Sequence, residues 1–218
     1  MAFQIPQIIY DFRDCINEKG ITACEKHKEG RRNSQEDEDN IKEIIKTKFP
    51  ERFTITKERN WCDGIIDDVI PVHIKSSKFL ASDNACGYPA LYSTFINSDM
   101  AKVDKIASNP MQPFLDSLSD IVNSDKKIID NDNYFLIFNK KTNLMIVNSI
   151  KNIKVFIPNL TNGLQINWNK NLQFSEETES INVFKNIIKK LKYISEKQEA
   201  KFKNQNDIYC SFLQYIEK

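Results

Sequence analysis

Apolar residues recur along this chain with two different periods, which together predict a mixture of helices and strands. Near the start, Ile8, Ile9, Phe12 and Ile16 follow the three-to-four-residue spacing of an amphipathic helix. By this criterion helices are expected at residues 6–19, 22–30, 34–49, 98–107, 111–123, 180–203 and 207–216. Short apolar runs rich in β-branched and aromatic residues predict strands at 53–56, 134–138, 144–147 and 154–157, and a hairpin at 63–76.

Turn and capping residues indicate where several of these elements begin and end. Gly20 lies just past the first expected helix, where glycine is a common stop. The segments Thr22–Glu25 and Ser34–Asp37 both have the form of a capping box, which predicts a helix start at each. Pro71 lacks a backbone N–H and therefore indicates an edge position or a distorted ladder inside the hairpin.

The chain shows no internal repeat and no linker, which predicts a single domain over residues 1–218. Within it we expect N-terminal helices at 1–50, a core of sheet and helices at 53–157, and a polar segment with helices at 158–218. A chain of this length can bury a core without a metal or a disulfide. The expected fold class is α/β, with a mixed central β-sheet flanked by helices on both sides.

Composition narrows the class of protein. With 40% hydrophobic residues, 14 Phe and 7 Tyr, the chain has the apolar side chains that disordered proteins lack. The first residues have neither the basic region nor the long apolar run of a signal peptide, and no run is long enough to span a membrane. The five cysteines are an odd number and form no CxxC motif, which is typical of reduced thiols. We therefore expect a soluble cytoplasmic protein without membrane contacts.

Charge is unevenly distributed although the net charge is only +1. Residues 63–130 contain 10 acidic and 6 basic side chains, whereas residues 131–218 contain 13 basic and 8 acidic ones. A net charge near zero argues against a protein that coats nucleic acid through bulk charge. An acidic centre followed by a basic segment suits an enzyme that holds a metal ion against a polyanion, although solvated surfaces also produce such asymmetry.

The most informative segment is the hairpin at 63–76. Asp63 opens its first strand, and His73 and Lys75 lie near the end of the second. If the turn takes Asp67, Asp68 and Val69, Asp63 lies directly opposite His73, and Lys75 points to the same face because side chains alternate along a strand. A carboxylate, an imidazole and an ammonium group would then share one face of the hairpin.

This arrangement resembles the core of the PD-(D/E)xK nuclease superfamily, to which type II restriction endonucleases belong. In that superfamily an Asp and a second acid, two positions before a Lys, hold Mg²⁺ at the mouth of the sheet. Asp63 and Lys75 match the first and last members of the motif, while His73 stands where the second acid is usual. Because Mg²⁺ prefers oxygen ligands, the resemblance implies a metal held by Asp63 and the Ile74 carbonyl. Either direct ligation or a hydrogen-bonding role remains open for His73, and Asp67 is the alternative ligand if the register differs.

Three further segments resemble parts of restriction enzymes and occur in the expected order. The helix after Gly30 resembles the one that brings a further acid, Glu38, to the metal, since Glu38 shares a helix face with Ile41 and Ile45. The other segments are the loop after Lys75 and a late polar segment at 159–168. The residues expected to contact DNA are Arg31, Arg32, Asn33, Ser34, Ser76, Ser77, Asn84, Asn162 and Gln165. Simpler interpretations of the same residues are helix capping, dipole compensation and turn chemistry.

The resemblance implies a restriction-endonuclease-like core and a type II site-specific deoxyribonuclease. Such an enzyme uses Mg²⁺ to cleave double-stranded DNA at a short sequence, leaves 5′-phosphate and 3′-hydroxyl ends, and acts as a homodimer on palindromic sites. A structure-specific repair or recombination nuclease is the enzymatic alternative, and a non-catalytic DNA-binding protein with a degenerate core is the other. No phosphate-cradling glycine loop is present, so no nucleotide cofactor is expected. A zinc site built from His27, Cys62, His73 and Cys86 lacks the usual paired spacing.

Overall fold

The computed structural model describes residues 5–58, 60–78, 82–124, 126–129, 131–161, 163–171, 179–198 and 203–217, with the backbone alone at 82–86 and 203–204. The helices in these parts are α1 (Gln7–Lys19), α2 (Gly30–Lys48), α3 (Tyr88–Phe95), α4 (Met100–Ile106), α5 (Met111–Ser124), α6 (Ser180–Lys197) and α7 (Lys203–Tyr215). The strands are β1 (Phe53–Ile55), β2 (Gly64–Ile66), β3 (Ile70–Ser77), β4 (Ser82–Cys86), β5 (Tyr134–Asn139), β6 (Leu144–Ser149), β7 (Phe156–Asn159) and β8 (Gly163–Asn167). The predicted α/β class is confirmed.

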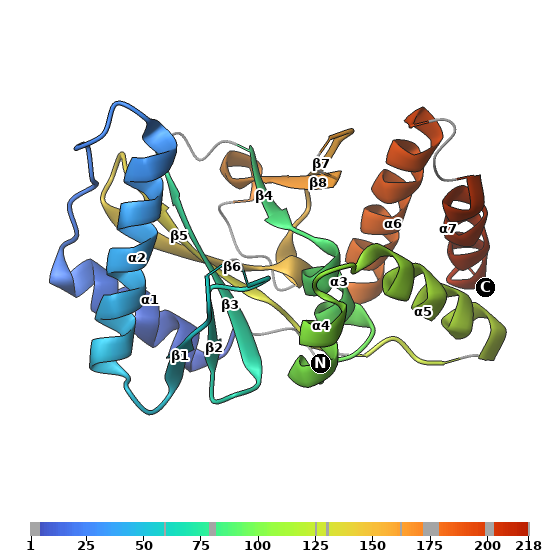
Figure 1. Cartoon of the computed structure of the whole chain (residues 1–218), viewed down its shortest axis with the longest axis horizontal. Coiled ribbons are helices and arrows are strands. Elements are labelled where there is room, and N and C mark those ends of the chain that lie inside the picture. The colour runs from blue at the N-terminus through green and yellow to red at the C-terminus, as the bar shows by residue number, and fades with distance from the viewer. Residues whose placement is uncertain are drawn as a thin grey trace.

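A five-stranded mixed sheet with the order β1-β2-β3-β5-β6 forms the centre of the molecule (Figure 1). The β3–β5 pair is parallel, with Val72 opposite Tyr134 and Ser77 opposite Asn139, and the other neighbouring pairs are antiparallel. A parallel pair needs a crossover, which α3, α4 and α5 provide. Pro71 lies one residue before the segment of β3 that pairs with β5, so its missing N–H interrupts no bond to that strand.

Two hydrophobic cores cover the two faces of this sheet, as the alternation along β5 shows. Tyr134, Leu136 and Phe138 pack with α1 and α2 on one face, whereas Phe135 and Ile137 pack on the other with α3, α5, α6 and α7. Figure 1 shows the same layering, with α1 and α2 on one side and the later helices on the opposite side. The prediction of helices on both sides of a mixed sheet is therefore confirmed.

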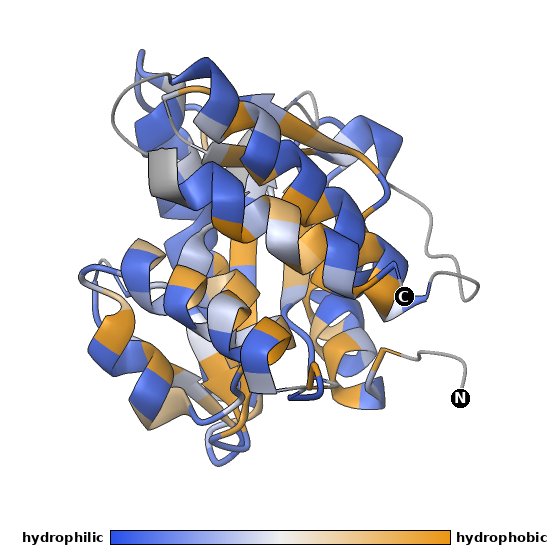
Figure 2. Ribbon diagram, turned by 90° about the vertical axis from the view of Figure 1, so that its right-hand side faces the viewer, coloured by the Kyte–Doolittle hydropathy of each residue, from blue (hydrophilic) through white to orange (hydrophobic). Residues whose placement is uncertain are grey.

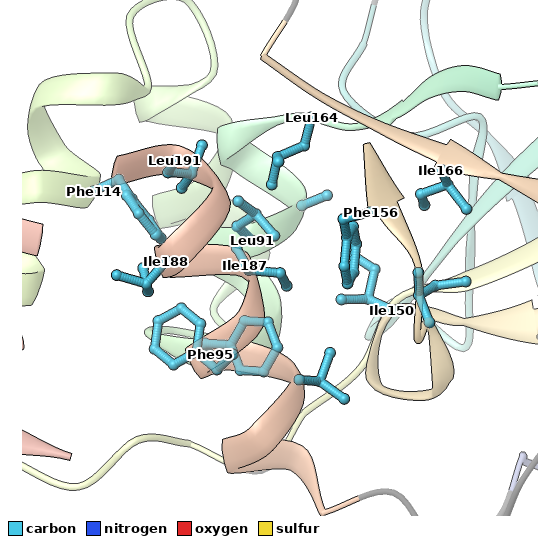
Figure 3. Packing of buried hydrophobic residues seen from close by; sticks show 14 of the residues in the cluster. Leu91, Phe95, Phe114, Ile150, Phe156, Leu164, Ile166, Ile187, Ile188 and Leu191 are labelled. Atoms are coloured by element: carbon cyan, nitrogen blue, oxygen red, sulfur yellow. The ribbon is translucent and has the colours of Figure 1, made fainter. Parts of the chain in front are cut away.

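The larger core is held together by residues from several elements. In Figure 3, side chains of α6, α3 and α5 converge with Phe156 of β7 and Leu164 and Ile166 of β8. Figure 2 shows hydrophobic and hydrophilic residues mixed along the helices facing the viewer, as expected of helices with one buried side. Among the described residues, no helix combines the length with the apolar character that crossing a membrane requires.

The start of α2 differs from the prediction. Residues 22–30 form no helix before Gly30, and α2 begins at Gly30 rather than at Ser34. The reason is that Asn33 and Asp37 bind the backbone of the preceding loop instead of capping a helix. Asn33 pairs through its amide with the N–H and carbonyl of His27, at 2.8 Å each, and Asp37 Oδ1 accepts the N–H of Cys24 at 2.7 Å.

Three elements were not predicted, namely the strands β4 and β8 and the helix α3. The backbone of residues 82–86, expected to be loop, forms β4, which joins β8 and β7 in a second antiparallel sheet with the order β4-β8-β7. The helix α3 was not expected either, because a short helix with few polar residues has no clear amphipathic pattern. Three smaller differences concern bounds. The strand β7 lies two residues later than expected, α6 ends at Lys197 instead of continuing to 203, and α7 begins at Lys203 instead of 207.

Candidate active site

The hairpin of β2 and β3 has the predicted register. Gly64 pairs with Val72 and Ile66 with Ile70, which leaves a three-residue turn at 67–69 and places Asp63 opposite His73. Asp67 adopts a positive φ of 49° in that turn and forms an ion pair with Arg52. Asp67 therefore lies at the opposite end of β2 from Asp63, and the alternative in which it replaces Asp63 as a metal ligand is wrong for this register.

An open edge on β3 is the central feature of the site. Beyond Gly64, where β2 stops pairing, the backbone groups of β3 on that side are met by carboxylates instead of a strand. Asp63 Oδ2 accepts the N–H of Ile74 at 2.8 Å, and Glu38 Oε1 from α2 accepts the N–H of Ser76 at 3.0 Å. These two N–H groups lie two residues apart on β3, a rise of about 6.6 Å. The structure thus brings Glu38 and Asp63 to the same edge, as expected.

The Ile74 carbonyl faces the same open edge, between the two carboxylates. The backbone groups of successive residues in β3 point alternately to its two sides. The Val72 carbonyl accepts the N–H of Asp63 on the side of β2, whereas the Ser77 carbonyl accepts the N–H of Lys140 on the side of β5. Because the N–H and the carbonyl of one residue point to the same side of a strand, Ile74 presents both groups to the open edge. Two carboxylates and a backbone carbonyl therefore meet here.

Lys75 lies beside this edge with its ammonium group close to Asp63. The Lys75 Nζ is 3.8 Å from Asp63 Oδ2, and their side chains are only 22% and 24% exposed. This separation is too long for a strong hydrogen bond, but the low exposure strengthens the attraction between the charges. Both residues and His73 line a cavity of about 450 Å³. Its other walls come from Asn60, Trp61, Cys62, Gly87, Tyr88, Pro89, Ala90, Ala107 and Pro110.

His73 is buried and committed to a hydrogen bond. Its Nε2 lies 3.3 Å from Asn133 Oδ1, and its ring stacks on Phe135. The Asn133 amide nitrogen donates to the Ser93 and Thr94 hydroxyls, so its oxygen must face the histidine and Nε2 carries the proton. Burial lowers the His73 pKa to about 4, which leaves the imidazole neutral at pH 7. Only Nδ1 remains for another partner, and the arrangement favours the structural interpretation of this histidine.

Sequence reasoning missed Asp37, which holds Glu38 in place. Asp37 is 2% exposed, and its Oδ2 accepts the Ser76 hydroxyl at 2.8 Å and pairs with Lys140 Nζ at 2.6 Å. Asn33 and Asp37 share the buried helix face with Ile41, and the four-residue spacing between the three could have indicated it. Glu38, which was expected on that face, is half-buried at the border of the face and reaches β3 from there.

Magnesium, which the resemblance implies, fits the groups at the open edge of β3. Within the described residues, no three or more His, Cys, Asp and Glu side chains form a group that could hold a metal ion. Mg²⁺ does not need such a group, because it is usually bound by one or two carboxylates together with water and substrate phosphates. Asp63, Glu38 and the Ile74 carbonyl supply that kind of oxygen donor set.

The residues expected to contact DNA fall into three groups. Arg31 and Arg32 are exposed at the start of α2, where Arg32 Nε lies 3.4 Å from Glu29 Oε2. Ser34, Ser77 and Gln165 are half-buried. Asn33 and Ser76 are buried with their polar groups bound inside the protein, so neither side chain is available to DNA in this structure. Asn162 lies outside the described residues, as does the side chain of Asn84.

Comparison with protein-family models, with curated proteins and with solved structures finds no significant match for this chain.

Proposed function

We propose that this protein is a Mg²⁺-dependent endonuclease that hydrolyses phosphodiester bonds in double-stranded DNA. The observation that carries the proposal is the open edge of β3, where the carboxylates of Asp63 and Glu38 flank the Ile74 carbonyl beside Lys75. An oxygen-rich site with an adjacent ammonium group suits a reaction in which negative charge develops on a phosphate.

Each residue at this edge has a distinct task in the proposed reaction. Asp63, Glu38 and the Ile74 carbonyl would hold the metal, which when bound offsets charge on the scissile phosphate and lowers the pKa of a coordinated water. The ammonium group of Lys75 orients the attacking water near the phosphate and stabilises the charge that develops there. His73, neutral and bound to Asn133, fixes the strand that carries Lys75.

By resemblance, the finer proposal is a type II restriction endonuclease that acts on a short specific sequence. The products would carry 5′-phosphate and 3′-hydroxyl ends. A palindromic site presents two strands to be cut, so two copies of the site related by a two-fold axis would be needed, which means a homodimer. The side chains that remain proposed to contact the duplex are those of Arg31, Arg32, Ser34, Ser77 and Gln165. A cytoplasmic location is part of the same proposal.

Cleavage of a long DNA by the purified protein with Mg²⁺, followed by mapping of the ends, tests the proposal. A reproducible set of fragments with ends at one short sequence is the expected result. Cleavage confined to flaps, mismatches or junctions would favour the structure-specific nuclease instead. Binding of DNA without any cleavage in Mg²⁺ or Mn²⁺ would point to a non-catalytic DNA-binding protein with a degenerate nuclease core. The observation that favours this alternative is His73 in the position of the second acid.

Lys75→Ala separates chemistry from binding. Loss of the ammonium group should lower the cleavage rate by at least about 100-fold, while the affinity for DNA measured without divalent metal changes little. Lys78→Ala is the matched control, because Lys78 lies just beyond the same strand but is exposed and pairs with Glu25 at 3.7 Å. Equal cleavage rates for both variants would refute the role assigned to Lys75.

A further inference from the structure

A groove between α6 and β7 lies on the part of the molecule that the proposed reaction does not use. It has a volume of about 430 Å³ and is lined by Pro158 of β7 and by residues of α6. The lining residues of α6 are Asn186, Lys189, Lys190 and Tyr193. Figure 1 shows α6 on the opposite side of the central sheet from α2. The groove shares no lining residue with the cavity beside Lys75 and is therefore a separate site.

The two walls of the groove are joined by hydrogen bonds, so its shape is defined by the fold. Asn186 Nδ2 donates to the Lys154 carbonyl, just before β7, at 3.3 Å. At the other end, Gln198 after α6 donates to the Leu160 carbonyl in the turn after β7. The groove also has an aromatic surface, since Tyr193 is 47% exposed and Lys197 Nζ lies 5.9 Å from the centre of its ring.

Apart from Lys197, which lies over the Tyr193 ring, the lysines of α6 divide into two kinds. Lys185 pairs with Glu217 at 2.9 Å, and Lys192 pairs with Glu196 at 3.3 Å. For the two groove lysines, Lys189 and Lys190, the described residues place no carboxylate oxygen within ion-pair distance. The groove therefore combines two lysines that form no ion pair among the described residues with an amide and an exposed aromatic ring.

We infer that this groove binds the sugar-phosphate backbone of DNA outside the position of cleavage. Two lysines outside any ion pair beside a groove suit adjacent phosphates, and the Tyr193 ring can pack on a deoxyribose. The identity of the polyanion rests on the proposed function. A duplex of 30 base pairs is about 100 Å long, which exceeds the width of a domain of this size, so the duplex extends beyond the cleaved site on both sides.

The salt dependence of DNA binding tests the inference directly. The affinity of a fluorescent 30-base-pair duplex is measured in the Lys75→Ala background without divalent metal, from 50 to 200 mM KCl. The groove variant is Lys189→Met with Lys190→Met, and the matched control is Lys185→Met with Lys192→Met. Both remove two charges from the same helix, but the control removes only lysines that already have a carboxylate partner. All four lysines are exposed or half-buried, so both variants should keep the thermal stability of the parent.

The groove variant should lower the slope of log affinity against log salt by about 1.8, because each phosphate contact contributes about 0.9. At 0.1 M KCl this corresponds to a loss of affinity of roughly tens of fold. The control should change the slope far less. Equal slopes for the two variants would overturn the inference. Binding of poly-glutamate, a polyanion without phosphate or sugar, is measured as well, and its loss in a groove variant that still binds DNA normally would also overturn the inference. If the wild-type protein cleaves DNA but the groove variant keeps the salt slope of its parent, only this inference fails. If neither the wild type nor any variant binds DNA, the proposed function fails as well.

Discussion

Replacing Asp132 by asparagine should reveal two opposing proton equilibria in the core behind the site. Asp132 precedes Asn133, the partner of His73, and is 3% exposed. Its Oδ1 accepts the N–H of Asn133 at 2.7 Å and that of Lys151 at 3.3 Å, and the neighbouring Ser149 hydroxyl and the charge of Lys151 also favour the ionised form. Asparagine keeps an oxygen for these two N–H groups but cannot ionise.

The magnitude follows from the two pKa values. Burial raises the Asp132 pKa from 3.8 to about 7, so the folded protein loses stability as pH rises through this range, by about 4 kcal/mol in total. Burial lowers the His73 pKa from 6.5 to about 4, so the folded protein loses stability as pH falls through that range, by about 3 kcal/mol. Between pH 4 and 6.5 the two slopes oppose each other and nearly cancel.

Asp132→Asn should therefore be more stable than wild type at pH 8, by up to about 4 kcal/mol, and about equally stable near pH 4. Between these limits the variant should lose stability on acidification, because the contribution of His73 is no longer cancelled. Urea denaturation at pH 4.5, 5.5, 6.5 and 8, followed by tryptophan fluorescence, measures this. Asp68→Asn, at an exposed turn position, is the control and should leave the profile unchanged. A difference between variant and wild type that does not depend on pH would refute the reasoning.

Two further changes test the packing around the site. Gly64→Ala would place a Cβ 2.2 Å from the ring of the buried Phe53, so it should lower the free energy of unfolding by about 1–3 kcal/mol in urea denaturation, whereas Gly30→Ala, with open space around it, should not. Asp37→Asn should cost about 3–5 kcal/mol because it leaves the Lys140 ammonium buried without its carboxylate, and Lys140→Met in the same chain should recover part of that loss. Additive effects of the latter two substitutions in a double-mutant cycle would contradict the pairing.

The parts of the site that could be predicted from the sequence are those fixed by neighbours along the chain. The register of the β2–β3 hairpin depends on the two aspartates that accept positive φ in the turn and on the alternation of apolar residues in both strands. These local rules were sufficient to place Asp63 opposite His73 and to put Lys75 on the same face.

The remainder of the site depends on contacts between distant segments. His73 and Asn133 are 60 residues apart, and no local pattern connects them. The buried face of α2 was predicted from Ile41 and Ile45, and both Asp37 and Glu38 precede these residues at helical spacing. The sequence therefore does not show which of the two acids lies on the buried face. In the structure it is Asp37, which contacts Ser76 and Lys140. The strands β4 and β8 pair with each other although 78 to 85 residues separate their paired positions, and β8 is only half apolar, which hides it from a search for apolar runs.

The open edge of β3 has a consequence for how this protein can vary. Three of the groups there, the N–H and carbonyl of Ile74 and the N–H of Ser76, belong to the main chain and persist under every side-chain substitution except proline. An alanine scan would therefore report Ile74 as an ordinary packing position, and at Ser76 it would report only the hydroxyl that donates to Asp37. Replacing single peptide bonds by esters, which removes one N–H and weakens one carbonyl at a time, would measure the contribution that such a scan cannot detect.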